Sequence, residues 1–248
     1  MHELKNKAEI EYIRQACRIV AHLLEYFHEI ARPGVTTEWL DQKAEAFIRR
    51  HGGEPAFKNY NGFPSSICTS VNQQVIHGIP GKYVLKEGDL LSIDVGVKKS
   101  GYYGDAAVTI PIGQISAKKQ KLVTTTREAL FEGIKQAVEN NHIVDISAAI
   151  QEHVEKKGFS VVKDFVGHGV GKKLHEEPPI PNYRTPGRGP KLISGMSLAI
   201  EPMVNMGKNQ VKIEEDKWTV VTADGLPSAH FEHTILVKGS EAEILTLY

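Results

Sequence analysis

The chain lacks the features that mark most specialised classes of protein. Its 248 residues include only two cysteines, Cys17 and Cys68, which excludes a disulfide framework and favours a reducing compartment. The 30 basic and 30 acidic residues cancel, and no block of one sign indicates nucleic acid or an anionic membrane as the main partner. No apolar run reaches membrane-spanning length, and the first residues contain no apolar signal core. We therefore expect a soluble, cytoplasmic protein.

Two pairs of amphipathic helices are predicted from the spacing of apolar residues. The first pair comprises a long helix over residues 7–31 and a shorter helix that Thr36 or Thr37 caps. The second pair comprises a helix that Ser116 caps and a helix over residues 145–157. This recurrence predicts a weak internal repeat.

The repeat and the composition together predict an α+β fold. A hydrophobic content of 41% is enough to fill one sizeable core, so we expect a single domain over 1–248 with halves of about 1–113 and 114–248. The strands of each half would form an antiparallel sheet with helices on its outer face. Beyond the central hairpin, strands are predicted over 159–166, 196–204 and 229–237, and a proline- and glycine-rich loop over 178–190.

A β-hairpin over residues 90–110 is the most informative stretch. Apolar residues alternate with small or polar residues on both sides of Ser100-Gly101, which supplies the turn. If the turn is centred between Lys99 and Ser100, Asp94 falls directly opposite Asp105. Like charges in that arrangement destabilise a sheet unless something positive lies between them. Taken alone, the pair is as compatible with two solvated aspartates as with a metal site.

Three further residues favour the metal interpretation. Glu201 and Glu232 lie on predicted strand faces with small or polar neighbours, and His168 lies in a glycine-rich turn. If these faces converge, four carboxylates repel one another until protons or cations neutralise them. A single catalytic zinc takes about three protein ligands, so this set fits two ions roughly 3.5–4 Å apart better. Oxygen-rich ligation with one imidazole suits Mn, Fe, Co or Zn.

Seven short motifs, in order along nearly the whole chain, resemble those of type I methionine aminopeptidases. They are 76–80 (IHGIP), 92–96 (SIDVG), 101–105 (GYYGD), 167–171 (GHGVG), 175–183 (HEEPPIPNY), 200–202 (IEP) and 231–234 (FEHT). The resemblance implies the pita-bread fold, in which two pseudo-symmetric halves carry an antiparallel sheet covered by helices. It also implies that the protein removes the N-terminal methionine from nascent proteins and peptides, preferably when the second residue is small.

The resemblance also implies a role for each site residue. The ligands of two divalent ions, which would activate the attacking water, are Asp94, Asp105, His168, Glu201 and Glu232. The catalytic residues that would act beside the ions are His77, His175 and Glu201, with Glu201 as proton shuttle and both histidines in contact with the substrate. The methionine pocket would be lined by Tyr60, Phe63, Cys68 and Trp218, with Phe57 and Leu174 at wall positions that vary within the family.

The implied partner is a peptide or nascent chain that begins with methionine. We expect a monomer with no nucleic-acid substrate, and the resemblance leaves open both the physiological metal and a transient contact with the ribosome. Three alternatives share the fold. X-Pro aminopeptidases and prolidases carry an added N-terminal domain, whereas here the first helix starts close to Met1. Type II methionine aminopeptidases carry a helical insertion, for which the short gaps between His175, Glu201 and Glu232 leave little room. A binding module without catalysis would be expected to lack one or more of the ligands.

Overall fold

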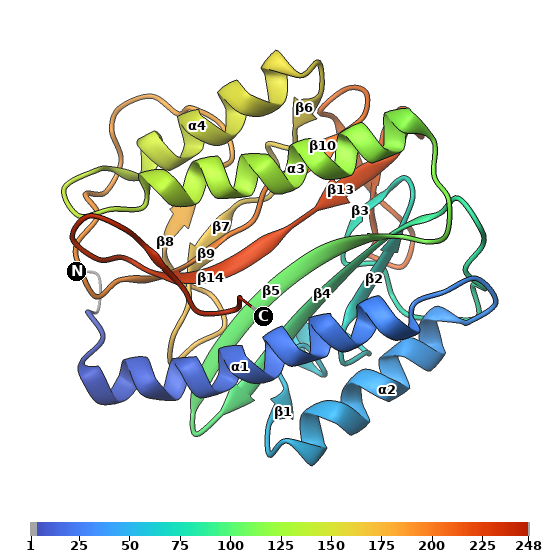
Figure 1. Cartoon of the computed structure of the whole chain (residues 1–248), viewed down its shortest axis with the longest axis horizontal. Helices are drawn as coiled ribbons and strands as arrows, with labels where there is room; N and C mark the ends of the chain where they lie inside the picture. Colours follow the sequence, from blue (N-terminus) through green and yellow to red (C-terminus); the bar gives the residue numbers. More distant parts are fainter. Residues whose placement is uncertain (1–3, 248) are drawn as a thin grey trace.

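Two helix pairs lie across one face of a central antiparallel sheet in the computed structural model, which describes residues 4–247 (Figure 1). The helices are α1 (Lys7–Ile30), α2 (Thr37–Arg50), α3 (Ala117–Gln136) and α4 (Ile143–Lys156), and a 3₁₀ turn covers Tyr60–Gly62. The predicted caps are confirmed, because the hydroxyls of Thr36 and Ser116 accept hydrogen bonds from the first turns of α2 and α3. None of the helices in the described range has the length and hydropathy needed to cross a membrane.

The central sheet has nine strands and spans both halves of the chain. Its order is β1-β4-β5-β14-β9-β7-β8, with β2 paired to β4 and β15 paired to β14. The bounds are β1 (Glu54–Pro55), β2 (Cys68–Val71), β4 (Leu90–Lys99), β5 (Tyr102–Pro111), β7 (Gly167–Gly169), β8 (Glu176–Ile180), β9 (Ser197–Ile200), β14 (Glu232–Leu236) and β15 (Glu243–Ile244). The two halves therefore contribute to one antiparallel sheet, joined where β5 pairs with β14, and the predicted α+β arrangement of helices over an antiparallel sheet is confirmed.

Two three-stranded sheets complete the structure. Their orders are β13-β10-β6 and β11-β12-β3. The bounds are β3 (Gln74–Ile76), β6 (Ser160–Val161), β10 (Met203–Asn205), β11 (Val211–Ile213), β12 (Val220–Thr222) and β13 (Ser228–His230).

Three of the predicted strand regions differ from the observed strands. The region 196–204 is split into β9 and β10, and the region 229–237 into β13 and β14, because each passes from the central sheet into a small one. Pro202, which has no backbone N–H to give to a ladder, lies at the first break. Only β6 forms within 159–166, and the predicted loop over 178–190 begins inside β8.

The register predicted for the hairpin is wrong by two residues. Gly96 pairs with Asp105, and Asp94 pairs with Ala107, so the two aspartates are diagonal neighbours on one face. The reason lies in the turn, where Ser100 and Gly101 have φ angles of 53° and 81°. Positive φ at both central residues gives the tight two-residue turn that matches strand twist, which centres the hairpin between those two residues.

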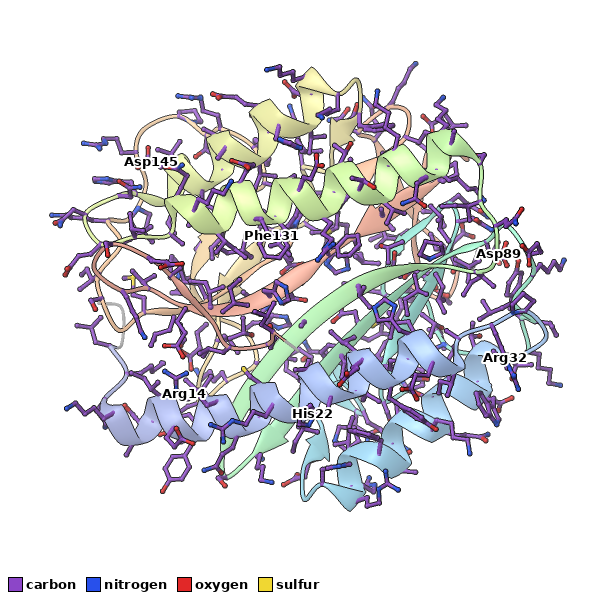
Figure 2. The ribbon with its side chains drawn as sticks, in the orientation of Figure 1. Arg14, His22, Arg32, Asp89, Phe131 and Asp145 are labelled. Atoms are coloured by element: carbon purple, nitrogen blue, oxygen red, sulfur yellow. The ribbon has the colours of Figure 1, made fainter. Side chains whose placement is uncertain are left out.

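The apolar face of the hairpin packs against the helices. Ile93, Val95 and Val97 are fully buried in the main hydrophobic cluster, as their alternation predicts. At Gly104, a Cβ atom would lie 2.6 Å from the backbone nitrogen of Cys17, so α1 rests directly on β5. Side chains fill the space between helices and sheet, including Phe131 of α3 (Figure 2). The opposite face of the sheet is left for the polar residues.

Candidate active site

Five neighbouring strands of the central sheet each bring one predicted ligand to the same face. The strands β4, β5, β14 and β7 carry their ligands directly, and the fourth carboxylate follows the last residue of β9. Across the sheet from β4 through β5, β14 and β9 to β7, the residues are Asp94, Asp105, Glu232, Glu201 and His168. Side chains that lie far apart in the sequence therefore meet because their strands are adjacent.

Small residues in the sheet make room for this cluster. Ala107 pairs with Asp94 on one side and with Glu232 on the other, so both carboxylates flank a methyl group. Asp105 is opposite Gly96, which has no side chain. The backbone N–H of Asp105 donates to the hydroxyl of Thr234 at 3.1 Å, and that hydroxyl donates to the Asp105 carbonyl at 2.7 Å. The positions of the carboxylates therefore follow from the register of the sheet and from the hydrogen bonds between β5 and β14.

The distances within the cluster suit a shared cation. Potential ligand atoms of Asp105, His168 and Glu232 all lie within 4.8 Å of one another. The Nε2 atom of His168 lies 3.6 Å from Oε1 of Glu201 and 4.0 Å from Oδ2 of Asp105. Its Nδ1 atom lies 2.9 Å from the Gly169 carbonyl, to which it donates. That hydrogen bond fixes the tautomer and directs the Nε2 lone pair at the carboxylates.

The electrostatics of the cluster call for neutralising charge. Burial raises the pKa of Asp94 to about 7 and, together with the charges of Glu232 and Asp94, raises the pKa of Asp105 well above its usual range. Burial and neighbouring carboxylates likewise raise the pKa of Glu201 and of Glu232. Burial, aided by the charge of His175, lowers the pKa of His168 to about 3, so its imidazole is a neutral ligand. This donor set fits divalent cations, which replace protons on such groups.

Three carboxylate oxygens support that fit independently. Within residues 4–247, Oδ1 of Asp94, Oδ1 of Asp105 and Oε1 of Glu232 are buried and have no hydrogen-bond partner. A buried carboxylate oxygen without a partner costs free energy, and cation ligation removes that cost.

Both predicted histidines lie beside the cluster. His77 has a φ of 59°, and burial together with the charge of His175 lowers its pKa to about 4. The ring of His175 stands at 81° to the ring of His168, with centroids 4.3 Å apart. Its Nδ1 atom lies 2.8 Å from the hydroxyl oxygen of Tyr60. Both imidazoles can therefore contact a substrate held at the carboxylates.

A single pocket of about 200 Å³ brings together every predicted site residue. Its lining includes the five predicted ligands, both histidines, and the wall residues Phe57, Tyr60, Phe63, Cys68, Leu174 and Trp218. Cys68 reaches the pocket because it pairs with Asp94 across β2 and β4. Phe63 and Trp218 meet edge to face with centroids 5.2 Å apart. The pocket thus combines an aromatic, sulfur-bearing wall with the acidic cluster.

Two residues that the sequence analysis missed belong to this region. Asn61 lines the pocket from the 3₁₀ turn, where its φ of 50° suits asparagine. His230 is buried beneath the site, with Nε2 3.8 Å from Oε2 of Glu201. Its spacing of two residues from Glu232, within the strand predicted over 229–237, is the pattern that could have revealed it.

The comparisons with known proteins agree on one family. The model of metallopeptidase family M24 matches residues 11–239. The chain is 54% identical to a methionine aminopeptidase of Clostridium perfringens and 51% identical to methionine aminopeptidase 1 of Bacillus subtilis. Each match covers 98% of both chains.

Two solved structures resemble the chain to different degrees. The crystal structure of methionine aminopeptidase from Thermotoga maritima matches with a TM-score of 0.98 and 46% identity over 100% of both chains. The prolidase from Pyrococcus furiosus matches with a TM-score of 0.82 and 24% identity, and the match covers 65% of that chain. The likeness to prolidase is one of fold alone, so the X-Pro alternative is not favoured.

Proposed function

The chain belongs to metallopeptidase family M24, and on that premise we propose that it removes the N-terminal methionine from peptides and nascent proteins. We further propose that two divalent ions bind the carboxylate cluster and that small second residues are preferred. The observation that carries the proposal is the convergence of one ligand from each of five neighbouring strands in a pocket with an aromatic, sulfur-bearing wall. The full-length identity to methionine aminopeptidases supports the choice of substrate.

The residues that would hold the ions are the five on the sheet. They are Asp94, Asp105, His168, Glu201 and Glu232. Two divalent ions would offset four carboxylates, and the mixed oxygen and imidazole set suits Co, Mn, Fe or Zn. When bound, such ions supply Lewis acidity, which polarises a carbonyl group and lowers the pKa of water.

The proton transfers fall to the protein's own side chains. Glu201 takes a proton from the water that attacks the carbonyl carbon, and it delivers this proton to the amine nitrogen as the C–N bond breaks. The carboxylate of Glu201 lines the same pocket as the other predicted ligands, so one of its oxygens can reach that water.

The two histidines would orient the scissile peptide. When the Tyr60 hydroxyl donates to Nδ1 of His175, the ring proton lies on Nε2, which can then donate to the developing oxyanion. The lowered pKa values of His175 and His77 keep both rings neutral, so each ring has one nitrogen that donates and one that accepts. His77, which lines the same pocket, would contact the scissile amide.

The wall of the pocket favours a methionine side chain. The buried thiol of Cys68 and the rings of Phe63 and Trp218 form a surface that a thioether contacts well. These side chains come from three separate segments, so the wall is shaped by the fold as a whole.

A competition between two peptides tests the proposal. Protein loaded in turn with Co²⁺, Mn²⁺, Fe²⁺ or Zn²⁺ is given Met-Gly-Ser together with Arg-Pro-Pro, and released amino acids are identified by mass spectrometry. We expect free methionine and intact Arg-Pro-Pro. Release of arginine alone would assign the chain to the X-Pro class, and release of neither residue with any metal would indicate a binding module.

A further inference from the structure

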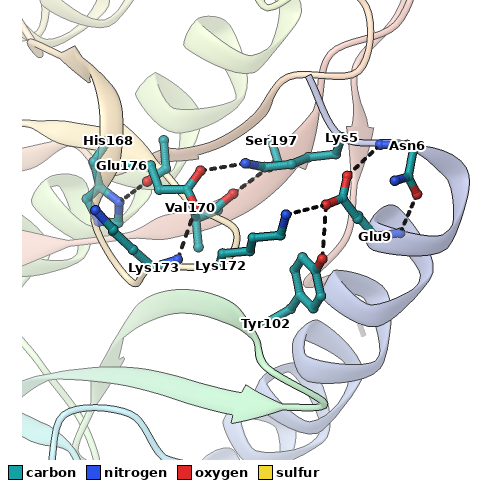
Figure 3. A network of polar contacts seen from close by, with 11 residues as sticks. Lys5, Asn6, Glu9, Tyr102, His168, Val170, Lys172, Lys173, Glu176 and Ser197 are labelled. Atoms are coloured by element: carbon teal, nitrogen blue, oxygen red, sulfur yellow. Dashed lines mark hydrogen bonds and ion pairs between the residues drawn. The ribbon is translucent and has the colours of Figure 1, made fainter. Parts of the chain in front are cut away.

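The loop that carries His175 is held from outside the pocket by the segment that precedes α1. This loop, residues 170–175, connects β7 to β8. Figure 3 shows two ion pairs on this side of the loop. Lys5 of the segment pairs with Glu176, the first residue of β8, and Glu9, in the first turn of α1, pairs with Lys172 of the loop. Glu176, the partner of Lys5, directly follows His175 in the sequence.

Lys5 makes a buried ion pair with Glu176. Its Nζ lies 2.6 Å from Oε2 of Glu176, and only 3% of its side chain is exposed. The other carboxylate oxygen, Oε1, accepts from the backbone N–H of Lys173 at 3.0 Å. Glu176 therefore closes the loop on itself and ties it to Lys5. Lysine is rarely so deeply buried, because desolvation of the ammonium must be offset by a well-placed partner.

The loop is shaped to admit this lysine. At Gly171, a Cβ atom would lie 2.5 Å from Cε of Lys5 and 2.8 Å from Oε1 of Glu176. The Gly171 carbonyl accepts from the backbone N–H of Tyr103 at 2.9 Å, which fixes the other side of the loop to β5. The absence of a side chain at this position is thus what lets the ammonium reach the carboxylate.

We propose that Lys5 is a positioning residue for His175. The inference rests on the proposed function, in which His175 donates to the oxyanion. The hydroxyl of Tyr60 contacts the His175 ring at Nδ1, whereas the ion pair of Lys5 with Glu176 fixes the backbone one residue away. Without the ion pair of Lys5 with Glu176, the His175 imidazole can move away from the carbonyl oxygen of the substrate, although no residue that lines the pocket has changed.

The test compares Lys5→Met with Lys172→Met. The second variant is a matched control, because Lys172 also ties the loop down, through an ion pair at 2.8 Å with Glu9 in the first turn of α1, but its side chain is 55% exposed. On Met-Gly-Ser we expect Lys5→Met to lower kcat about tenfold with KM changed less than about threefold, since a misplacement near 1 Å costs up to ~100-fold. We expect Lys172→Met to keep kcat within about twofold, and metal content to be unchanged in both variants.

Introducing Lys5→Met into protein that already carries His175→Ala distinguishes a positioning role of Lys5 from general structural damage. In His175→Ala protein, Lys5→Met should produce no further fall in kcat, because the residue it positions is gone. If Lys5→Met does not fold, Glu176→Gln replaces it, since glutamine keeps an oxygen for the Lys173 N–H and removes only the charge.

Four outcomes overturn the inference. They are an unchanged kcat in Lys5→Met, an equal loss in Lys172→Met, a loss that persists undiminished in the His175→Ala background, and a loss of bound metal. Failure of the proposed function is a different result, namely wild-type protein that releases no methionine or His175→Ala protein with full kcat.

Discussion

Replacing Asp94 with asparagine should stabilise the metal-free protein as the pH rises. In the folded chain burial raises the pKa of Asp94 from 3.8 to about 7. Below pH 4 the carboxyl is protonated in both the folded and the unfolded state, so it contributes nothing to pH dependence. Between pH 4 and 7 the unfolded chain has lost this proton and the folded chain has kept it, so the free energy of unfolding falls as pH rises.

The size of this effect follows from the shift itself. Each pH unit in that window costs ~1.4 kcal/mol, and the full rise of the pKa amounts to about 4 kcal/mol near pH 7. The amide of the Asp94→Asn variant cannot titrate, so the difference in unfolding free energy between variant and wild type should grow in favour of the variant across the window. The charge of Asp94 also helps to raise the pKa values of Asp105, Glu201 and Glu232, so its removal lowers those pKa values and adds to the difference in the same direction.

Urea denaturation of chelator-treated protein at pH 5, 6 and 7 measures the effect. Asp164→Asn serves as control, because Asp164 is exposed and is not among the residues that line the pocket, and its curve should run parallel to that of the wild type. Adding divalent metal at pH 7 should reverse the ranking, since the wild type keeps all five predicted ligands and binds the ions more tightly than the variant, which lacks one carboxylate. If the free energies of unfolding of Asp94→Asn and wild type change equally with pH, the reasoning that burial of Asp94 destabilises the metal-free fold as pH rises is refuted.

Three shorter predictions test other parts of the argument. Glu232→Gln should lose bound metal and activity together, and retention of two ions per chain by elemental analysis would contradict its role as ligand. His77→Ala should lower kcat about 100-fold with metal content intact, and full activity would remove it from the site. Gly104→Ala should lower the free energy of unfolding by about 1–3 kcal/mol, because its Cβ would meet the Cys17 backbone at 2.6 Å, whereas Gly239→Ala, with no atom within 4 Å, should unfold at the wild-type temperature in a thermal scan.

The helices and the strand faces were predictable because their determinants are local. Thr36 and Ser116 cap helices through hydrogen bonds within four residues, and alternation in the hairpin needs only the period of two. The register was not predictable from alternation alone, since it depends on whether Ser100 adopts a positive φ. The shift of two residues kept Asp94 and Asp105 on one face, so the predicted cluster survived the wrong pairing.

The joining of the two halves could not be derived from local patterns. The pairing of β5 with β14 brings Ala107 beside Glu232, and the residues involved are far apart in the sequence. No periodicity specifies which strands become neighbours, and a repeat is equally compatible with two separate sheets. The sequence motifs carried this information only through resemblance to a family whose members share the arrangement.

The position of the acidic cluster explains why the fold tolerates it. The sheet is apolar on the face that packs against the helices, so the free energy of burial is gained there, on side chains such as Ile93 and Val95. The opposite face can then carry four carboxylates at a cost that cations remove when they bind. Small residues such as Ala107 leave space for the ligands without loss of strand pairing. A larger residue at 107 would therefore damage ligand geometry while leaving the hydrophobic face intact, which separates the requirements of the site from those of the fold.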